Sequence, residues 1–429
     1  MAWSLTDRLA ALEHATGRQS SLGGGQGDLP AAGEDNPSRT HPGSGGEGGV
    51  AGLDDLGFRR LPNGVWHREM RYDLLTRHGE GRFADLLTSP LEVLAKAVHW
   101  SKEVAVGVEN LRFYDTETSG LGSGAGTFPF LHAVAQVDGD ELVLYQYLLS
   151  DYGEEVNLLT TLAQIHFTPN TGVVSFNGKS YDWPLLQNRL RLHRLPDLKI
   201  LQMDLLHPAR RMWRHVLEKV SLEQVERHML GVLRQEDLPS REAPQRYFAF
   251  LDDGDARILA PVLSHNALDV CSLVVLTARL ATLLAGTRIP VYAHEYVGVA
   301  SYYDEWRETE LADSCLQAAV NCPDADWRVH WLHSLRAKRA GQWDQAAVLW
   351  SEMMIRYRWS VAPCVELAKF AEHRSKDLVA AREWARTALH RAITNPTNGS
   401  NAEVLQQLRH RLARIERKLS GLTGINAKQ

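Results

Sequence analysis

Cysteine is scarce in this chain, with four residues among 429. None of the four stands in a Cys-x-x-Cys pair, and so few in so long a chain exclude a disulfide framework. Cys315 and Cys322 precede His330 and His333, but this spacing fits no compact zinc motif, so we expect buried thiols on helices. Reduced thiols are typical of the cytoplasm, where we expect the protein to work.

Long apolar runs and an excess of positive charge are also missing. We find no run of about 18 apolar residues, so we expect no membrane span. The N-terminus is amphipathic and lacks the apolar core of a signal peptide. With 47 Lys+Arg against 52 Asp+Glu, the formal net charge is −5. This charge excludes a wholly basic nucleic-acid binder but leaves room for a local basic groove.

Glycine is unevenly spread, with 11 of the 33 glycines between Gly23 and Gly52. Residues 18–52 are rich in Gly, Ser and Pro and cannot bury enough surface to fold, which predicts a disordered linker after a short helix at 1–17. Residues 53–110 have a mixed pattern. We expect them to be a leading segment that packs on the domain that follows.

Residues 111–150 contain three apolar runs rich in aromatic and β-branched residues, LRFYDTE, PFLHAVAQV and ELVLYQYLL. They predict three antiparallel strands, the last two joined by a turn at 138–140. A helix at 154–167, a strand at TGVVSFN, a helix from YDWPLL and a strand at LKILQMDLL follow. Further helices are expected at 208–218, 221–230, 244–251 and 256–285. This order predicts an α/β domain at 111–288, with a mixed sheet and flanking helices.

Residues 290–429 are predicted to be helical, with an internal repeat. GQWDQAAVLW from residue 341 aligns with SKDLVAAREW from residue 375, an offset of 34 residues, which is the tetratricopeptide period. An earlier partial unit is expected at 295–322, where Ala312 and Leu316 lie one period before Ala346 and Trp350. An ordinary helical bundle with coincidental spacing is the alternative. Residues 402–419 are expected to form a basic capping helix.

Two carboxylates end the first of these strands. Asp115 and Glu117 alternate with Thr116, so strand geometry places both on one side of the sheet. Two like charges beside the apolar Phe113 and Tyr114 repel each other unless a cation lies between them, which favours a divalent metal. A polar pair on a solvated edge is the other interpretation.

Two more carboxylates and a histidine follow at matching places. Asp182 begins a predicted helix just after a strand, where a carboxylate can also act only as a helix cap. Asp269 lies in an otherwise apolar helix, where burial of an unpaired carboxylate is costly. His265 precedes it by four residues and shares its helix face. A structural His–Asp pair is the alternative there.

These motifs and the order of elements resemble the DEDD family of 3′–5′ exonucleases, which has a ribonuclease H-like fold. The resemblance is most detailed to its YprB-like branch, in which tetratricopeptide-like repeats follow the ribonuclease H-like domain. It covers roughly residues 53–420. The stretches that carry it are YDTETSGLGSGAGTFPFL, SFNGKSYDWPLL, MDLLHPARRMW and HNALDVCSL.

The resemblance implies a metal-dependent nuclease that trims 3′ ends of single-stranded DNA or RNA. Asp115, Glu117, Asp182 and Asp269 would hold two divalent cations, Mg²⁺ or Mn²⁺, for hydrolysis. His265 would be the general base. It stands four residues before the last aspartate, where one exonuclease branch has a tyrosine and another has a histidine one residue earlier.

Several residues near these carboxylates are candidate substrate contacts. The glycine-rich loop at 120–126 lacks the following helix of a Rossmann fingerprint and the GK[ST] of a triphosphate site, so it is either a backbone-exposing loop near the metals or a flexible loop. The basic stretch at 207–215 suits phosphates and stacked bases, or is a solvated helix face. Asp204 either approaches the metals or caps a helix. The candidates are Thr116, Gly126, Thr127, Asn177, Lys179, Asp204, Arg210 and Arg211.

Two functions are compatible with this sequence. One is the nuclease, with nucleic acid as its partner. The other is a catalytically idle nucleic-acid-binding or scaffold protein that recruits a protein partner through its helical repeats. The complete carboxylate set favours the nuclease, because an idle site has no reason to keep four costly charges.

Overall fold

The computed structural model describes residues 52–101, 106–120, 126–234, 238–239, 241–394 and 402–426. The helix expected at 1–17, nearly all of the linker at 18–52 and positions 121–125 of the glycine-rich loop lie outside the described residues. The chain divides into two compact units, the first ending at Val291 and the second running from Tyr292.

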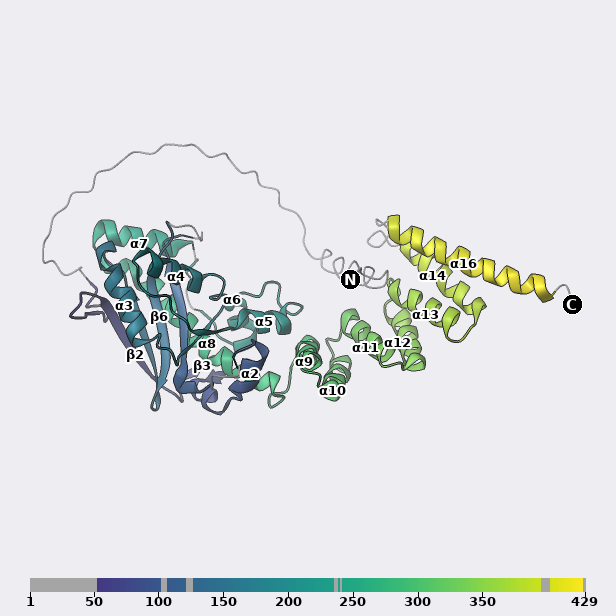
Figure 1. Ribbon diagram of the computed structural model, residues 1–429, viewed down its shortest axis with the longest axis horizontal. Coiled ribbons are helices and arrows are strands. Elements are labelled where there is room, and N and C mark those ends of the chain that lie inside the picture. Colours follow the sequence, from purple (N-terminus) through teal and green to yellow (C-terminus); the bar gives the residue numbers. More distant parts are fainter. Residues whose placement is uncertain are drawn as a thin grey trace, which may run out of the picture. The chain divides into compact units, whose positions relative to one another are not determined.

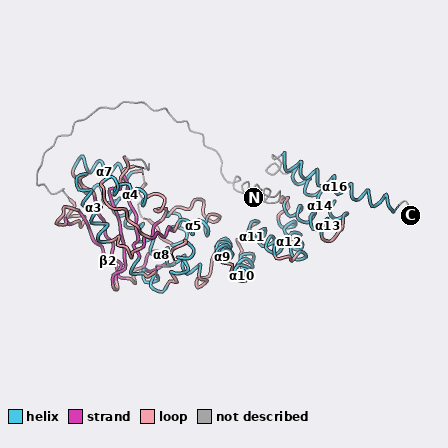
Figure 2. The backbone as a smooth tube through the Cα atoms, viewed as in Figure 1, coloured by secondary structure: helices cyan, strands magenta, loops and turns pink. Residues whose placement is uncertain are grey.

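The first unit is built on a seven-stranded mixed sheet with the order β1-β2-β7-β6-β5-β8-β9 (Figures 1 and 2). Its strands are β1 (Arg59–Arg60), β2 (Trp66–Asp73), β5 (Leu111–Thr118), β6 (Pro129–Asp138), β7 (Glu141–Leu148), β8 (Gly172–Ser175) and β9 (Leu201–Asp204). Strands β5, β6 and β7 form the predicted antiparallel meander. Strand β8 pairs parallel with both β5 and β9, which makes the sheet mixed.

The leading segment takes part in this sheet. Strand β2 pairs antiparallel with β7 over its whole length, from Trp66 to Asp73. The described remainder of the segment contains a two-stranded sheet of β3 (Arg77–His78) and β4 (Gly81–Arg82), and the helix α2 (Leu91–Ala97). The segment therefore supplies edge strands of the main sheet.

Helices cover the two faces of the sheet. They are α3 (Glu155–Ile165), α4 (Asp182–Leu192), α5 (Leu206–Trp213), α6 (Leu222–Val225), a π-helical turn (Glu226–Leu230), α7 (Glu242–Asp253) and α8 (Ala260–Leu284). Tyr114 and Asp115 are neighbours on β5, so their side chains point to opposite faces. The Tyr114 ring contacts Trp183 of α4, whereas Asp115 is bonded to Asn266 of α8. Helices α4 and α8 thus lie on opposite faces.

Helix α8 is the central helix of this unit. Residues 256–284 are long and apolar enough to pass for a membrane span, contrary to our expectation that no segment would be, but 83% of the most apolar window is buried inside the protein. Among the described residues this is the one such helix. Its apolar character is accounted for by its position against the sheet, where Val270, Val274 and Leu276 are fully buried.

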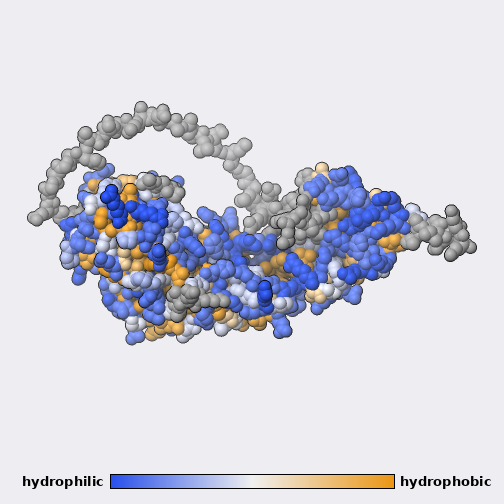
Figure 3. Space-filling model, in the orientation of Figure 1, coloured by the Kyte–Doolittle hydropathy of each residue, from blue (hydrophilic) through white to orange (hydrophobic). Residues whose placement is uncertain are grey.

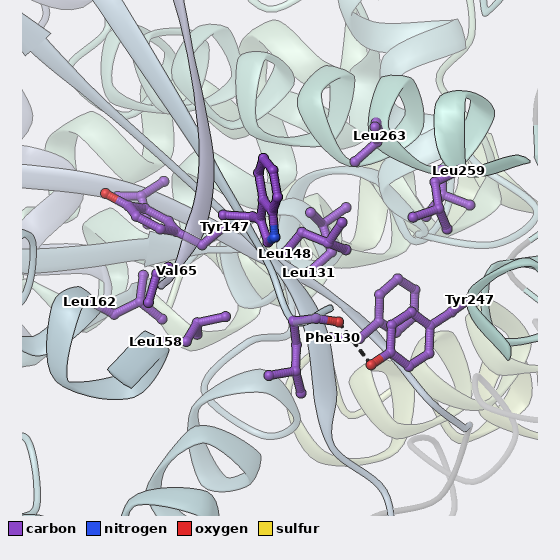
Figure 4. Close-up of a cluster of buried hydrophobic side chains, with 14 of the residues drawn as sticks. Val65, Phe130, Leu131, Tyr147, Leu148, Leu158, Leu162, Tyr247, Leu259 and Leu263 are labelled. Atoms are coloured by element: carbon purple, nitrogen blue, oxygen red, sulfur yellow. Dashed lines mark hydrogen bonds between the residues drawn. The ribbon is translucent and has the colours of Figure 1, made fainter. Parts of the chain in front are cut away.

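The main core lies where α3, α7 and the start of α8 meet the meander. Figure 4 shows Phe130 of β6 and Tyr247 of α7 side by side. Their rings are stacked with centroids 4.1 Å apart, and the Tyr247 hydroxyl donates a hydrogen bond to the carbonyl of Leu149 over 2.9 Å. The aromatic ring is buried and its one polar atom is satisfied, so α7 is held firmly against the sheet.

The second unit is helical throughout its described residues. Its helices are α9 (Ala293–Glu305), α10 (Thr309–Val320), α11 (Trp327–Arg339), α12 (Trp343–Arg356), α13 (Ala362–His373), α14 (Leu378–Thr394) and α16 (Ala402–Asn426). Helices α11 and α12 begin 34 residues after α9 and α10, and α13 and α14 begin 35 residues after α11 and α12. Ala312 and Leu316 are buried, as are their counterparts Ala346 and Trp350. The period seen in the sequence therefore corresponds to stacked helix pairs.

Candidate active site

Asp115 is tied to helix α8 through two uncharged residues. Its Oδ2 accepts a hydrogen bond from Nδ2 of Asn266 over 2.8 Å. The Oδ1 of Asn266 in turn accepts from Nε2 of Gln146, on β7, at 2.9 Å. Because Gln146 donates to Asn266, the orientation of the Asn266 amide is determined by the network itself. The position of Asp115 is therefore set by two strands and a helix together.

Glu117 follows Asp115 by two residues, so its side chain is on the same face of β5. The pairing of β5 with β6 shifts register directly after Glu117, between Glu117 and Thr118. Such a bulge bends the strand and redirects its last side chains. The strand therefore ends its regular pairing at the second carboxylate of the predicted site.

Asp182 reaches the site from the opposite face of the sheet. It is the first residue of α4, and its Oδ1 accepts a hydrogen bond from the Thr116 hydroxyl. Thr116 is therefore a contact of a predicted metal ligand. The loop before α4 leaves no room for a side chain at Gly178, where a Cβ atom would lie 2.5 Å from Ser175 Oγ and 3.2 Å from Asp182 Oδ2.

Asp204 has a structural role in the loop before α4. Its carboxylate accepts hydrogen bonds from the backbone N–H groups of Asn177 (2.8 Å), Lys179 (3.2 Å) and Leu206 (3.0 Å). Asn177 has a left-handed backbone with φ of 69°, which the first of these bonds helps to hold. Of its two predicted roles, the structure supports the structural one, since the carboxylate is occupied by the backbone. The side chains of Asn177 and Lys179 are exposed.

His265 of α8 lies between two of the predicted metal ligands. Its Nε2 is 3.6 Å from Asp269 Oδ2 and 3.9 Å from Glu117 Oε1. The spacing of four residues places His265 and Asp269 on one face of α8, as the sequence indicated. Asp115, Glu117, His265 and Asp269 are thus all on the α8 side of the sheet, while Asp182 comes from the α4 side.

Arg234 is part of this site, although no sequence motif marks it. Its buried guanidinium forms an ion pair with Asp269 and a two-bond contact with Glu226, at 2.6 and 2.8 Å. Nη1 of Arg234 also lies 2.8 Å from Nδ1 of His265. Arginine can only donate, so Nδ1 of His265 must accept, and the proton of a neutral His265 is on Nε2.

Burial and mutual repulsion define the electrostatics of the site. Burial raises the pKa of Asp115 well above its ordinary value, and the neighbouring carboxylates of Asp269, Asp182 and Glu117 raise it further. Burial also raises the pKa of Glu117, and it raises the pKa of Asp182 to about 6. These carboxylates are therefore costly to ionise together unless a cation joins them.

The donors are of the right type for Mg²⁺ or Mn²⁺, because both ions prefer hard carboxylate oxygens. Their positions, in contrast, do not form a coordination site. Within the described part of the chain, no three His, Cys, Asp or Glu side chains lie close enough together to hold a metal ion. In the structure Asp269 is paired with Arg234, and Asp182 accepts a hydrogen bond from Thr116. The residues fit the ions chemically, but a coordinating arrangement requires side chains to move.

The remaining candidates divide into two groups. The glycine-rich loop starts beside the site, since the carbonyl of Gly120 accepts from the hydroxyl of Tyr181, the residue before Asp182, over 3.1 Å. At the far end of that loop, Gly126 and Thr127 are described, and the Thr127 hydroxyl lies near Gly120. Arg210 and Arg211 lie on α5, exposed and half-buried respectively.

Of the two interpretations of the basic stretch at 207–215, the stacking of bases is not available to its tryptophan. Trp213 is fully buried, and the Arg279 guanidinium of α8 lies over its ring at 6.0 Å from the centroid. The ring faces the core because α5 packs its apolar side inward, so it has no exposed face for a base.

A pocket opens next to His265. It has a volume of about 720 Å³ and lies between the start of α8 and the N-terminal part of α7. Arg234 and His265 form one side of it, and Glu242 and Arg246 form another. This volume is in the range of small-ligand sites, about 300–1,000 Å³.

Comparison with known proteins agrees with this architecture. Residues 112–281, which run from β5 into α8, match the RNase_H superfamily. The chain is also 33% identical over 362 residues to the uncharacterized protein YprB of Bacillus subtilis (strain 168), over 82% of this chain and 86% of that relative. Since the similarity extends over most of both chains, this protein belongs to the YprB family, with an RNase H-like domain followed by an all-helical region.

Proposed function

We propose that the protein is a divalent-metal-dependent nuclease that hydrolyses phosphodiester bonds of nucleic acids. Its RNase H superfamily domain supports a nuclease type of function. The observation that carries the proposal is the mutual electrostatic repulsion of four acidic side chains from β5, α4 and α8, with His265 3.9 Å from Glu117 and 3.6 Å from Asp269. Carboxylates whose pKa values are raised by one another are a common feature of catalytic sites.

The finer proposal is a 3′–5′ exonuclease that acts on single-stranded DNA or RNA in the cytoplasm. It rests on the resemblance to DEDD exonucleases, together with the pocket beside His265. That pocket has room for a terminal nucleotide, and Arg246 at its wall can meet a phosphate. A pocket of this size beside His265 can take the last nucleotide of a strand, which favours attack at chain ends.

In this proposal Asp115, Glu117, Asp182 and Asp269 hold two Mg²⁺ or Mn²⁺ ions. When bound, such ions supply an activated water and neutralise charge on the leaving oxygen. His265 accepts the proton of the attacking water. Its Nε2 can do so only when its own proton has moved to Nδ1, which in the structure accepts from Arg234.

The contacts of Arg234 therefore affect both a metal-binding Asp269 and the proton on His265. Turning its guanidinium away releases Asp269 to act as a metal ligand, and it also frees Nδ1 of His265 to carry the proton. The ion pair with Glu226 gives the guanidinium a second partner, so it does not lose all its counter-ions when it turns. We infer that metal entry and the exchange of Arg234 contacts occur together.

The test is the degradation of end-labelled DNA and RNA oligonucleotides with Mg²⁺ or Mn²⁺, comparing free and blocked 3′ ends. We expect loss of nucleotides from free 3′ ends only, and at least a 100-fold slower reaction for Asp115→Asn and Asp269→Asn. Asp197→Asn is the matched control, because Asp197 is an exposed aspartate paired with Arg191. Equal activity in all three variants and the wild type would refute the proposal.

One observation favours the second candidate function, a catalytically idle nucleic-acid-binding or scaffold protein that recruits a partner through its helical repeats. The Arg234–Asp269 ion pair partly neutralises the site without any metal. An idle protein would show no metal-dependent cleavage with any of these substrates. It would also lose a protein partner when the surface of α9 to α16 is changed, while substitution of Asp115 has no effect on that partner.

A further inference from the structure

The helical unit contains two stretches of opposite charge. Residues 292–326 contain one arginine and eight acidic residues, a net charge of −7. Residues 327–429 contain 18 Lys+Arg and eight Asp+Glu, a net charge of +10, in a chain whose total is −5. In Figure 3 the end of this unit formed by α13 to α16 is largely hydrophilic. The positive charge of the second unit is therefore concentrated from α11 onward.

Part of this charge surrounds a buried glutamate on α13. The Glu372 side chain has no exposed surface, and its carboxylate accepts from Arg414 Nη2 at 2.6 Å and from Lys418 Nζ at 2.7 Å. Arg411 Nη1 lies 3.5 Å from the same carboxylate. Arg411, Arg414 and Lys418 are at positions i, i+3 and i+7 of α16, so they share one face of that helix.

A second buried glutamate, Glu366, lies six residues before Glu372 on α13. Glu366 accepts from Lys338 Nζ, on α11, and from Lys369 Nζ, each at 2.5 Å. Burial lowers the pKa of Lys369, and Glu366 raises it. The charges of Lys338 and Arg411 lower it further, so a cation beside Glu372 also acts on the cations around Glu366. We call Lys338, Lys369, Arg411, Arg414 and Lys418 the cationic cluster.

The cationic cluster has more positive charge than its glutamates neutralise. Five cations face two carboxylates, which leaves three positive charges in surplus. Neutralisation of a buried carboxylate requires one cation, and further cations repel one another. The Lys418 side chain is 47% exposed and that of Arg414 is 35% exposed, so a ligand can reach them from solvent. Nε of Arg414 has no hydrogen-bond partner within the described residues.

We propose that the cationic cluster is a nucleic-acid-binding surface that contacts backbone phosphates without reading the base sequence. Lysine and arginine bind phosphates by charge and release the counter-ions around the strand. The cluster presents its surplus from α11 and α16, which suits a run of phosphates. The choice of nucleic acid over another polyanion rests on the proposed nuclease function. The substrate of the first unit is then also the ligand of the helical unit.

The test variant removes the surplus alone. Lys338→Gln/Arg414→Gln/Lys418→Gln leaves Lys369 with Glu366 and Arg411 with Glu372, so each buried carboxylate keeps a cation. The matched control, Arg71→Gln/Arg191→Gln/Arg257→Gln, removes three positive charges as well. Those arginines are exposed on the first unit and paired with Glu141, Asp197 and Asp255. Both variants therefore have the same net charge.

Binding is measured on the full chain by fluorescence anisotropy with a labelled single-stranded oligothymidylate, in EDTA so that no cleavage occurs. The slope of log affinity against log salt concentration should become shallower by about 2 in the cluster variant. Each lost phosphate contact changes this slope by about 0.7, and the variant removes three cations. Affinity at low salt should fall about tenfold, while the control variant should match the wild type. An unchanged slope and affinity in the cluster variant would overturn the proposal.

Two other polyanions distinguish a nucleic-acid surface from a lipid-binding or peptide-binding one. Binding of anionic phospholipid vesicles and of polyglutamate is measured with the same variants. If the cluster variant loses binding to either of them but still binds the oligonucleotide, the proposal is also overturned. If the triple variant is unfolded by circular dichroism, Lys418→Gln replaces it, with an expected change in slope of about 0.7. Asp115→Asn, which should abolish cleavage, should leave this binding intact, so a failure of the proposed nuclease activity remains distinguishable from a failure at the cluster.

Discussion

Nδ2 of Asn266 donates a hydrogen bond to Oδ2 of Asp115 over 2.8 Å, joining α8 to β5. Asn266 is fully buried, and Gln146 binds the other end of its amide. An uncharged side chain thus holds the first β5 carboxylate of the predicted site. The geometry of the candidate active site depends on this network as much as on the acidic residues.

Substitution of Asn266 should therefore change both stability and activity. In Asn266→Ala, Asp115 and Gln146 each lose a buried partner, which we expect to lower the free energy of unfolding by about 1–3 kcal/mol. Cleavage should fall at least tenfold in protein that is still folded. Urea denaturation and the oligonucleotide assay measure the two effects. Asn157→Ala, at an exposed asparagine that donates to a backbone carbonyl, is the control and should change neither.

Divalent ions should stabilise the protein through the same carboxylates. Without metal, Asp115→Asn should raise the melting temperature, because one of several mutually repelling buried charges is removed. Millimolar Mn²⁺ should raise the melting temperature of the wild type by several degrees and that of Asp115→Asn much less. Differential scanning fluorimetry measures both. A wild type that does not respond to Mn²⁺ or Mg²⁺ would contradict a metal site here.

Arg234 should compete with metal for Asp269. In Glu226→Gln/Arg234→Met the buried arginine and its other carboxylate partner are removed together, so no unpaired Glu226 charge is left. We expect half-maximal stabilisation at a several-fold lower Mn²⁺ concentration than in the wild type. We also expect the pH profile of cleavage to shift, since His265 Nδ1 loses its donor. A higher Mn²⁺ requirement in this variant would show that Arg234 assists the metal.

Position 178 should require a glycine. A Cβ atom there would lie 2.6 Å from Cβ of Ser175, so Gly178→Ala forces the loop before α4 to shift and moves Asp182. We expect a loss of about 1–3 kcal/mol in stability from overpacking, with reduced cleavage. Gly126→Ala is the stability control, because nothing lies within 4 Å of its Cβ position. Equal unfolding midpoints for the two variants would contradict the close fit.

Acid should destabilise the first unit through two buried histidines. Burial lowers the pKa of His132 and of His166 from 6.5 to about 3, and each is bonded to a tyrosine hydroxyl, of Tyr114 and Tyr147. Between pH 6.5 and 3 the unfolded chain binds more protons at these positions, so stability is present above pH 6.5 and is lost as the pH falls. Unfolding free energies measured from pH 7 to 4 should show this decline, and a shallower one in His132→Gln.

Local periodicity in the sequence was enough to predict most elements. Apolar runs rich in aromatic and β-branched residues predicted β5, β6 and β7 as a meander, and the 34-residue offset corresponds to the spacing of the helix pairs. These predictions succeeded because each depends on residues near one another in the chain. Likewise, a strand places Asp115 and Glu117 on one face, and a helix does the same for His265 and Asp269.

Contacts between distant segments were decided by the tertiary structure alone. Pairing of β2 with β7, the bond from Asn266 to Asp115, and the ion pair of Arg234 with Asp269 join residues that no spacing rule connects. Burial of Trp213 and of the apolar α8 likewise depends on what packs against them. The sequence by itself determined which acidic and basic groups the protein has and which local elements present them. Only folding decided which charges meet out of water, where their interactions are strongest, and so which pairs compete and which cations remain in surplus.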